Sequence, residues 1–400
     1  MIFLEKHNIP ADYKKSAVGI IPQEWNVERL GEICLTFKSG ATITSQSIKE
    51  SGLYPVYGGN GLRGYTDSYT HNGDYILIGR QGALCGNINF IRGKAYISEH
   101  AIAVQPNESN SIEYLRYKLD FWNLNRFSES SAQPGLSVEK LVRYKLAVPP
   151  LAEQRKIAEI LGVWDEAIEK QSRLIEKLEL RKRGLMQRLF TGRTRLTGFT
   201  TPWQKVKLGE IGKFDKGAGV PKNKITSSGC KAITYGEIYT KYNYVINRFA
   251  SYIDEETARE SKEISSGTIL FAGSGETLED IGKCVAFIDE GVAYAGGDII
   301  IFKPTIEVDS LVLSYILNSP SAIKQKRKYG HGHSVVHIYQ KDLAKIELEL
   351  PYLSEQKAIA EVLTVADNEI ATHRKKLDAL RLQKRGLMQQ LLTGKIRVKI

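Results

Sequence analysis

The chain has 400 residues, of which 42% are hydrophobic and 25% charged, and its formal net charge is +11 at pH 7. This length allows two or three domains with cores of their own, and the positive charge favours a polyanionic partner such as nucleic acid. No apolar run reaches the roughly 18–20 residues that span a bilayer, and the four cysteines form no Cys-x-x-Cys pair, so we expect a cytoplasmic protein without a structural zinc.

The first 150 residues predict a mixed domain of strands and helix. Short apolar runs bounded by Gly and Asn indicate strands at 54–57, 74–78 and 101–104, and residues 112–127 predict a helix. The segment Gly59-Asn60-Gly61-Leu62-Arg63-Gly64 matches the Gly-x-Gly-x-x-Gly pattern of dinucleotide-binding folds. Turn residues follow it where such folds need a helix, so we predict no nucleotide site there.

A long helix is predicted from residue 151 onward. Pro149-Pro150 end the preceding strand, and Gly192 supplies a terminating glycine. Apolar residues recur at intervals that alternate between four and three over more than four heptads, which indicates a coiled coil. The expected seam residues are Ile157, Leu161, Trp164, Ile168, Ile175, Leu178 and Leu185.

Residues 196–350 predict a second mixed domain with its elements in a similar order. Strands are expected at 268–271, 284–287 and 298–302, followed by a helix over 310–328. The strands that begin near residues 74 and 268 are expected to occupy the same place in the two domains, because each follows a glycine and carries an apolar run.

The segment from residue 351 repeats the first long helix at an offset of 202 residues. Between Glu153–Arg195 and Glu355–Arg397, 21 of 43 positions are identical without a gap. The expected seam of the second helix is Ile359, Leu363, Ile370, Leu377, Leu380 and Leu387. We predict that the two helices pair with each other, with packing of each helix on its own domain as the alternative. Polar Gln171 and His373, at equivalent seam positions, would then help to select the register.

Two further patterns resemble parts of enzyme sites, and each lacks what the chemistry requires. Residues 271–275 resemble the glycine loop with which adenine methyltransferases hold the methyl donor, but the sequence contains no Asn-Pro-Pro-aromatic motif. His331, His333 and His337 have no carboxylate pair nearby in sequence, which favours solvated or phosphate-facing histidines over a metal site. A phosphate-binding loop, a His-Glu-x-x-His motif and a nucleophile elbow are missing from the sequence. We therefore predict that this chain catalyses no reaction by itself.

The order of these motifs closely resembles the specificity subunits of type I restriction-modification enzymes, over essentially the whole chain. The resemblance rests on Trp25-x4-Leu30-Gly31-Glu32-Ile33, Pro149-Pro150-Leu151-x-Glu153-Gln154, Lys182-Arg183-Gly184-Leu185-Met186-Gln187 and Thr191-Gly192, most of which recur in the second half. One departure is Pro351-Tyr352-Leu353, which replaces the Pro-Pro-Leu of the first copy.

The resemblance implies an α+β (mixed) fold with two globular target-recognition domains, joined by two long helices that pair as an antiparallel coiled coil with internal pseudo-twofold symmetry. The expected limits are 1–150 and 196–350 for the domains, 151–195 for the first helix and linker, and 351–400 for the second helix. Each domain is expected to read one half of a bipartite target in double-stranded DNA. The helices are expected to space the domains and to dock two methyltransferase (modification) subunits, which nuclease-translocase (restriction) subunits join. Methyl donor, ATP and magnesium are expected on those partners, and no cofactor or metal in this chain.

Polar residues in turns and Gly-rich segments are the candidates for base contacts, because Arg suits guanine and Asn or Gln suits adenine in the major groove. They are Asn60, Arg63, Arg80 and Gln81 in the first domain and Lys222, Asn223, Lys224, Ser274 and Glu276 in the second. The cluster Lys324, Lys326, Arg327 and Lys328 at the end of a predicted helix is expected to contact phosphates. For each of these residues the alternative is a solvated surface side chain.

Three other functions stay open at this point. One is a specificity chain of a related system in which nuclease and methyltransferase are fused. Another is a stand-alone adenine methyltransferase built around residues 271–275, and the third is a coiled-coil scaffold that never meets DNA.

Overall fold

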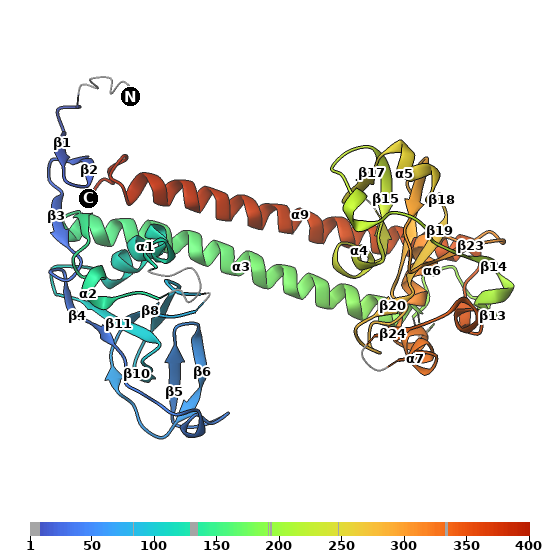
Figure 1. Cartoon of the computed structure of the whole chain (residues 1–400), viewed down its shortest axis with the longest axis horizontal. Helices are drawn as coiled ribbons and strands as arrows, with labels where there is room; N and C mark the ends of the chain where they lie inside the picture. The colour runs from blue at the N-terminus through green and yellow to red at the C-terminus, as the bar shows by residue number, and fades with distance from the viewer. Residues whose placement is uncertain are drawn as a thin grey trace. The chain divides into compact units, whose positions relative to one another are not determined.

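The computed structural model describes residues 9–82, 84–128, 135–190, 192, 194–246, 248–332 and 335–400. The chain folds into two compact units, whose elements are labelled in Figure 1. Unit 1 comprises Met1–Arg173 and Lys375–Ile400, and unit 2 comprises Leu174–Arg374. Each unit therefore contains one domain, the N-terminal half of one long helix and the C-terminal half of the other.

The domain of unit 1 contains two four-stranded sheets. The order along the first sheet is β4 (Cys34–Ser39), β11 (Ala101–Pro106), β8 (Tyr75–Gly79) and β9 (Ile88–Ile91), with antiparallel neighbours. The order along the second is β6 (Gly61–Thr66), β5 (Tyr54–Gly58), β10 (Lys94–Ile97) and β7 (His71–Asn72), in which β5 and β10 are parallel. Two further pairs are β1 (Tyr13–Ser16) with β2 (Gly19–Pro22) and β3 (Asn26–Arg29) with β12 (Lys145–Val148).

The domain of unit 2 has the same strand order. Its first sheet is β14 (Gly212–Lys216), β23 (Ile299–Pro304), β19 (Thr268–Ala272), β21 (Cys284–Phe287) and one added strand, β16 (Val245–Ile246). Its second sheet is β17 (Ser251–Ile253), β15 (Cys230–Ile233), β22 (Val292–Ala295) and β18 (Lys262–Ser265), in which β15 and β22 are parallel. The remaining pairs are β13 (Gln204–Lys207) with β25 (Glu347–Leu350) and β20 (Ser274–Gly275) with β24 (Val336–His337). The two domains thus share a topology although the sequences between the repeated segments differ.

Short helices connect the strands. They are α1 (Ile112–Trp122) and α2 (Val138–Leu141) in unit 1, and α4 (Tyr235–Thr240), α5 (Glu255–Arg259), α6 (Ser310–Leu317), α7 (Pro320–Lys328) and α8 (Gln340–Leu343) in unit 2. The single helix predicted over 310–328 is wrong. Pro320 has no N–H to continue a helix, and Ser319 Oγ caps the next helix by accepting a hydrogen bond from the N–H of Ala322. The helix predicted over 112–127 ends at Trp122, where Asn123 adopts a left-handed conformation, and a 3₁₀ turn follows.

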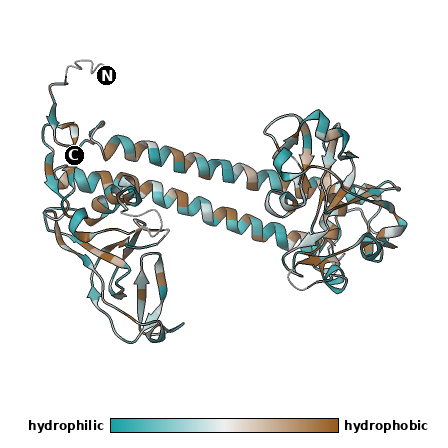
Figure 2. Ribbon diagram, viewed as in Figure 1, coloured by the Kyte–Doolittle hydropathy of each residue, from teal (hydrophilic) through white to brown (hydrophobic). Residues whose placement is uncertain are grey.

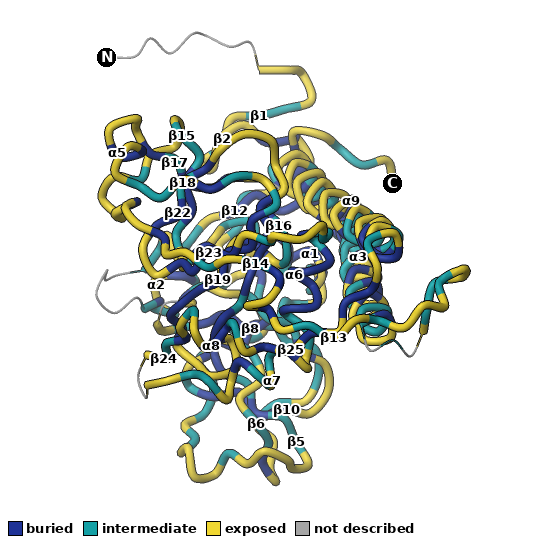
Figure 3. The backbone as a smooth tube through the Cα atoms, turned by 90° about the vertical axis from the view of Figure 1, so that its right-hand side faces the viewer, coloured by how far each residue is buried: buried dark blue, intermediate teal, exposed yellow. Residues whose placement is uncertain are grey.

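Alternation along the strands builds the cores. In β8, Ile76 and Ile78 pack with Leu115 and Leu119 of α1, whereas Leu77 faces a separate cluster on the other side of the sheet. In Figure 2 hydrophobic residues gather inside both domains. In Figure 3 the strands there, such as β8 and β19, are mostly buried. The long helices are instead mixed in hydropathy, as a coiled coil requires.

The two long helices, α3 (Leu151–Phe190) and α9 (Leu353–Leu391), pair in antiparallel orientation within each unit. In unit 2, ion pairs join Glu179 to Arg374, Arg181 to Glu369 and Lys182 to Asp367, so residue numbers rise along α3 as they fall along α9. In unit 1, Lys384 pairs with Asp165 in the same sense. Every predicted seam residue is buried or half-buried. The α+β fold with an antiparallel coiled coil is therefore confirmed.

The helix starts also contact their own domains, which was the alternative. Ile157 and Leu161 lie in one cluster with Trp25 of the first domain and with Met388 and Leu391 of α9. Both expectations thus hold for the first turns of α3. No helix in the described part of the chain is long and apolar enough to cross a membrane.

Candidate functional site

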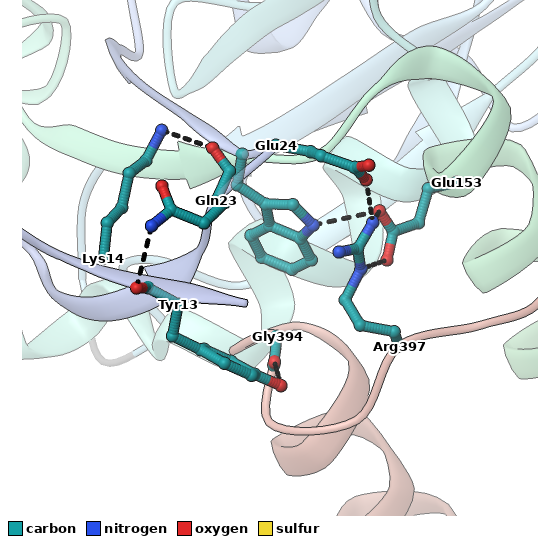
Figure 4. A network of polar contacts seen from close by, with 8 residues as sticks. Tyr13, Lys14, Gln23, Glu24, Glu153, Gly394 and Arg397 are labelled. Carbon is teal, nitrogen blue, oxygen red and sulfur yellow. Dashed lines mark hydrogen bonds and ion pairs between the residues drawn. The ribbon is translucent and has the colours of Figure 1, made fainter. Parts of the chain in front are cut away.

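The repeated glutamate at the start of each long helix forms a buried clamp. In unit 1 the fully buried carboxylate of Glu153 accepts a hydrogen bond from Trp25 Nε1 at 3.0 Å, and bonds from Arg397 Nε at 2.7 Å and Nη2 at 2.9 Å (Figure 4). Glu24 also accepts a bond from Arg397 at 2.6 Å. These carboxylates hold the pKa of Arg397 above its usual value. The start of α3 is thereby tied to the first domain and to the segment that follows α9.

Unit 2 repeats the clamp with the equivalent glutamate and arginine, 202 positions later and earlier, and with the tryptophan of its own domain. Glu355, also buried, accepts a bond from Trp203 Nε1 at 3.0 Å and two bonds from Arg195, each at 2.7 Å. Arg195 donates in addition to the carbonyl oxygen of Thr201. The hydrogen bonds to Glu355 raise the pKa of Arg195. The identical Trp, Glu and Arg of the two copies are therefore explained by contacts within the chain.

The repeated glutamine beside that glutamate ties the long helix to a short one. Gln154 Oε1 accepts a hydrogen bond at 2.8 Å from the N–H of Ser111, the residue that caps α1. Gln356 Oε1 accepts one at 2.8 Å from the N–H of Asp309, which caps α6. Each amide also donates to the carbonyl oxygen of a proline, Pro149 or Pro351.

The repeated lysine near the end of each helix joins the two helices to a domain. Lys182 donates to Asp367 and, at 3.0 Å, to the hydroxyl of Tyr315, which itself donates to Asp367. Lys384 and Asp165 form the matching pair in unit 1, where Tyr117 donates to Asp165. Burial, followed by the bonded aspartate, raises the pKa of both tyrosines.

The first domain brings two of the candidate base-contacting residues together. Arg80 and Gln81 follow β8, and the Arg80 N–H donates to the carbonyl oxygen of His100 at 2.9 Å. The Arg80 carbonyl accepts a bond from the N–H of Leu136 at 2.9 Å, and Gln81 forms a bridge with Gly135. Three segments of the chain therefore meet in what we call the junction of this domain. The other candidates are exposed, Asn60 in the turn between β5 and β6 and Arg63 within β6.

The second domain has a junction with the same backbone bonds. The Gly273 N–H donates to the carbonyl oxygen of Asp298 at 2.7 Å, and the Gly273 carbonyl accepts a bond from Ile338 at 3.0 Å. Ser274 pairs with His337 through β20 and β24. A hollow at this junction is lined by Lys216, Gly273, Ser274, Asp298, Ile299, Ile300, His337, Ile338, Tyr339, Gln340 and Lys341. Ser274 is itself buried, so it is placed to orient a neighbour and not to meet a ligand from outside.

The remaining candidates of the second domain lie in several places. Lys222, Asn223 and Lys224 are exposed on a 3₁₀ turn, and Glu276 is exposed after β20.

The basic cluster on α7 needs one correction. Lys324, Arg327 and Lys328 are exposed, as phosphate contacts must be. Lys326 is buried, donates to the carbonyl oxygen of Gly282 at 2.6 Å, and has its pKa lowered to about 8 by burial. Helical periodicity points this side chain inward while its neighbours point outward, so we remove it from the candidate phosphate contacts.

Two of the three candidate metal-binding histidines, His331 and His337, lie in the described part of the second domain. His331 and His337 pair through their backbones, and His331 Nε2 lies 3.6 Å from Asp342 Oδ2, whereas His333 lies outside the described residues. Among the described residues no three metal-binding side chains form a group that could hold an ion.

A groove runs along the coiled coil of unit 2. It is lined by Arg181, Lys182, Gly184, Leu185, Arg188, Val362, Val365, Ala366 and Glu369. A Cβ atom built on Gly184, or on the equivalent Gly386 in unit 1, meets no atom within 4 Å. Val365 and its counterpart Val163 are each 62% exposed. Sequence reasoning missed this groove, although the repeated glycine was visible as part of a motif.

Comparisons with known proteins place these features in context. A family model described as the type I restriction modification DNA specificity domain matches twice, over residues 22–180 and 201–382. The chain is 44% identical over 140 residues to the type I restriction enzyme EcoprrI specificity subunit of Escherichia coli, a match that covers 34% of this chain and 35% of the relative. It is 26% identical to the type I restriction enzyme MjaVIII specificity subunit of Methanocaldococcus jannaschii, over 95% of this chain and 94% of the relative. Its fold is similar to that of an S subunit of a type I restriction-modification system from M. genitalium, with a TM-score of 0.59, 16% identity, and coverage of 94% and 96%.

Proposed function

The chain belongs to the type I restriction modification DNA specificity family, and on that premise we propose that its two domains each read one half of a bipartite target in double-stranded DNA. The observation that carries the proposal is the repeated topology. Both domains have the same two sheets in the same strand order and the same clamp to a long helix, yet their exposed side chains at equivalent positions differ. One framework with two different surfaces suits two different half-sites.

The positive charge supports binding to the DNA backbone. The net charge of +11 attracts a polyanion, and exposed Lys324, Arg327 and Lys328 form a basic patch on α7. Contacts to phosphates supply affinity without sequence information, so the choice of sequence rests on other side chains.

The chain acts without chemistry of its own in this proposal. Methyl donor, ATP and magnesium belong to its methyltransferase and nuclease-translocase partners. Residues 271–275 support this assignment, because they form the end of β19, a turn and β20, and their glycines accommodate the close approach of Asp298 O and Tyr239.

The groove along the coiled coil of unit 2 and the equivalent surface of unit 1 are the docking surfaces for two methyltransferase subunits. Glycine inside a helix costs about 1 kcal/mol relative to alanine. Gly184 and Gly386 lie within α3 and α9, and nothing in the described chain crowds either position. Both copies nevertheless have glycine there. In unit 2 Gly184 lines the groove together with the exposed Val365 of the other helix, and the equivalent residues of unit 1 are Gly386 and the exposed Val163. A backbone that approaches from outside the chain explains both features, and two copies of the surface accommodate two copies of one partner.

A domain exchange tests the division of labour. Residues 35–148 are replaced by the matching part of another family member, and the methylated motif is determined by sequencing host DNA. One half of the motif should change while the other half stays, because the second domain and both helices are untouched. A change in both halves would contradict the assignment of one half-site to each domain.

Bulky substitutions test the docking surfaces. Gly184→Leu and Gly386→Leu should each remove one methyltransferase subunit from the purified complex, and the double variant should remove both, as measured by native mass spectrometry. Ala379→Leu adds similar bulk at an exposed position of α9 and should leave the stoichiometry unchanged. If the glycine variants keep two bound subunits, the partners dock elsewhere.

A further inference from the structure

The junctions of the two domains combine one backbone arrangement with different side chains. The loop after β8 or β19, the turn before β11 or β23, and the segment before α2 or α8 make the same hydrogen bonds to one another in both units. The residues at equivalent positions are Gln81 and Ser274, His100 and Asp298, Gly135 and His337, and Ser137 and Tyr339. Two different half-sites require different side chains on a shared backbone arrangement, and the junctions have both.

In the first domain the junction presents an exposed amide and an exposed imidazole. Gln81 Oε1 lies 3.1 Å from His100 Nδ1, which fixes both side chains, and Glu99 lies 3.4 Å from the other ring nitrogen of His100. Gln81 is exposed, and an amide offers the donor and acceptor that the major-groove edge of adenine requires. Sequence reasoning had singled out Gln81 but not its partners.

In the second domain the junction presents a carboxylate and an imidazole. Asp298 is exposed and has φ +62°, a conformation that a non-glycine residue adopts at a cost and that Asp tolerates better than most. Ser274 Oγ lies 3.0 Å from His337 Nδ1 and so orients that ring. Lys216 and Lys341 line the same hollow and are exposed, where they can neutralise flanking phosphates.

Other candidate surfaces lack this equivalence. The turn that carries Asn60 joins β5 directly to β6, whereas α4 and β16 separate the corresponding strands β15 and β17 in unit 2. Lys222, Asn223 and Lys224 lie on a 3₁₀ turn, and the sequence between β4 and β5 has a 3₁₀ turn of Ser45–Ser47 with no basic residue. The junction is a polar surface that both domains build in the same way.

Resting on the proposed function, the geometry points to the junction as the base-reading surface of each domain, with Gln81 in unit 1 and Asp298 in unit 2 as specificity-determining residues. His337 and His100 flank them, and Ser274 is a positioning residue that acts through His337. Asp298 offers only acceptors, which suits the amino group of cytosine or adenine, whereas Gln81 offers both a donor and an acceptor.

Two substitutions of nearly equal shape test this inference. Gln81→Glu replaces the amide donor with an acceptor, and Asp298→Asn adds a donor at a position where Asn also tolerates positive φ. The full chain with its methyltransferase subunits is incubated with a random pool of duplexes, and the bound fraction is sequenced. Gln81→Glu should change the preferred base at one or two positions of one half-site, with discrimination altered roughly 5- to 150-fold, and Asp298→Asn should do so in the other half-site.

The outcomes distinguish a failure of the proposed function from a failure of the inference about the junction. If the unsubstituted complex selects no bipartite motif, the proposed function fails. If it selects one and both substitutions leave it unchanged, the inference about the junction fails while the function stands. Uniform weakening without altered preference would also overturn it, as would altered preference from Asn60→Ala and Lys222→Ala alone.

Discussion

The two units have the same residues where one repeated segment contacts the other, and different residues at the exposed junctions of their domains. Trp25, Glu153 and Arg397 in unit 1 make the same bonds as Trp203, Glu355 and Arg195 in unit 2. At the junctions, by contrast, Gln81 and His100 stand where unit 2 has Ser274 and Asp298. Internal repetition therefore separates residues that maintain the assembly of helices and domains from residues that are free to set a target.

The residues at the coiled coil and beside it are not all the same in the two units. Trp164 is half-buried at the seam of unit 1, whereas the equivalent residue in unit 2 is Ala366, which lines an open groove. Lys118 in unit 1 is buried and donates to the carbonyl oxygen of Leu392 beyond α9. The corresponding position of α6, next to Tyr315, is the apolar Ile316.

The largest expected effect comes from breaking the clamp. Glu153→Ala removes a buried carboxylate and leaves Arg397 with Glu24 and Trp25 without its acceptor, so we expect the free energy of unfolding to fall by about 3–5 kcal/mol. Glu355→Ala should cost more, because Arg195 retains only the carbonyl of Thr201. Urea denaturation measures both.

The matched control for the clamp is Glu169→Ala, which breaks an exposed ion pair with Arg173 and should cost less than about 1 kcal/mol. Equal costs for Glu153→Ala and this control would show that the clamp does not hold the unit together.

The next effect is the pH dependence of stability that a buried lysine causes in each unit. Burial lowers the pKa of Lys118 to about 8, against 10.5 for an exposed lysine, so the unfolded chain binds more protons between these values. Stability should therefore rise with pH from 8, by about 2–3 kcal/mol at pH 10 for this residue. Lys118→Met should flatten that rise. Burial also raises the pKa of Cys34 and Cys284, whose unfolded thiols ionise within this window and lower stability, so the lysine contribution is the difference between the unsubstituted chain and the variant. The measurement stops at pH 10, because burial raises the pKa of Tyr114 and stability then falls further as unfolded tyrosines ionise.

Lys326 provides the comparison in unit 2, since burial lowers its pKa to about 8 as well. Lys326→Met should remove a similar part of the rise, and the double variant should remove both parts. A pH profile that neither substitution alters would mean that both lysines stay protonated when buried.

A smaller effect compares the lysines that join the helices. Lys182 lies over the rings of both Tyr244 and Tyr315, whereas Lys384 lies over Tyr117. Replacement by Met should cost roughly 1–3 kcal/mol in each unit through the lost charged hydrogen bond. Lys182→Met should cost about 0.5–1 kcal/mol more, which is the contribution of the additional ring. Equal losses in urea denaturation would show that the second tyrosine contributes nothing.

The smallest effect concerns the phosphate contacts of unit 2. Substituting Lys324, Arg327 and Lys328 with Ala should weaken binding to all duplexes alike and reduce the slope of log K against log salt by roughly one unit per lost contact. Sequence preference should persist. A changed preference with an unchanged slope would instead place these residues at base edges.

Sequence reasoning found the elements whose signals are local. The heptad pattern predicted both long helices and their seam. Apolar runs predicted strands at 74–78, 101–104 and 268–271, and the structure has them at Tyr75–Gly79, Ala101–Pro106 and Thr268–Ala272. It failed where a local signal was overlooked or was outweighed by tertiary packing. Ser319-Pro320 broke a predicted helix, and Lys326 was assigned to phosphates although its position on α7 faces the core.

By itself the sequence determined that the chain carries one module twice, that each module ends in a long helix, and that two domains with different contents stand between the repeats. Periodicity and repetition are written in neighbouring residues, so no coordinates are needed to find them. Only the tertiary structure decided why particular residues repeat. Glu153 meets Arg397 across 244 positions, and Gln81 meets His100 through a turn between two strands. Such pairs form because folding brings distant segments together. The separation of two residues along the sequence does not predict how far apart they lie in the folded chain.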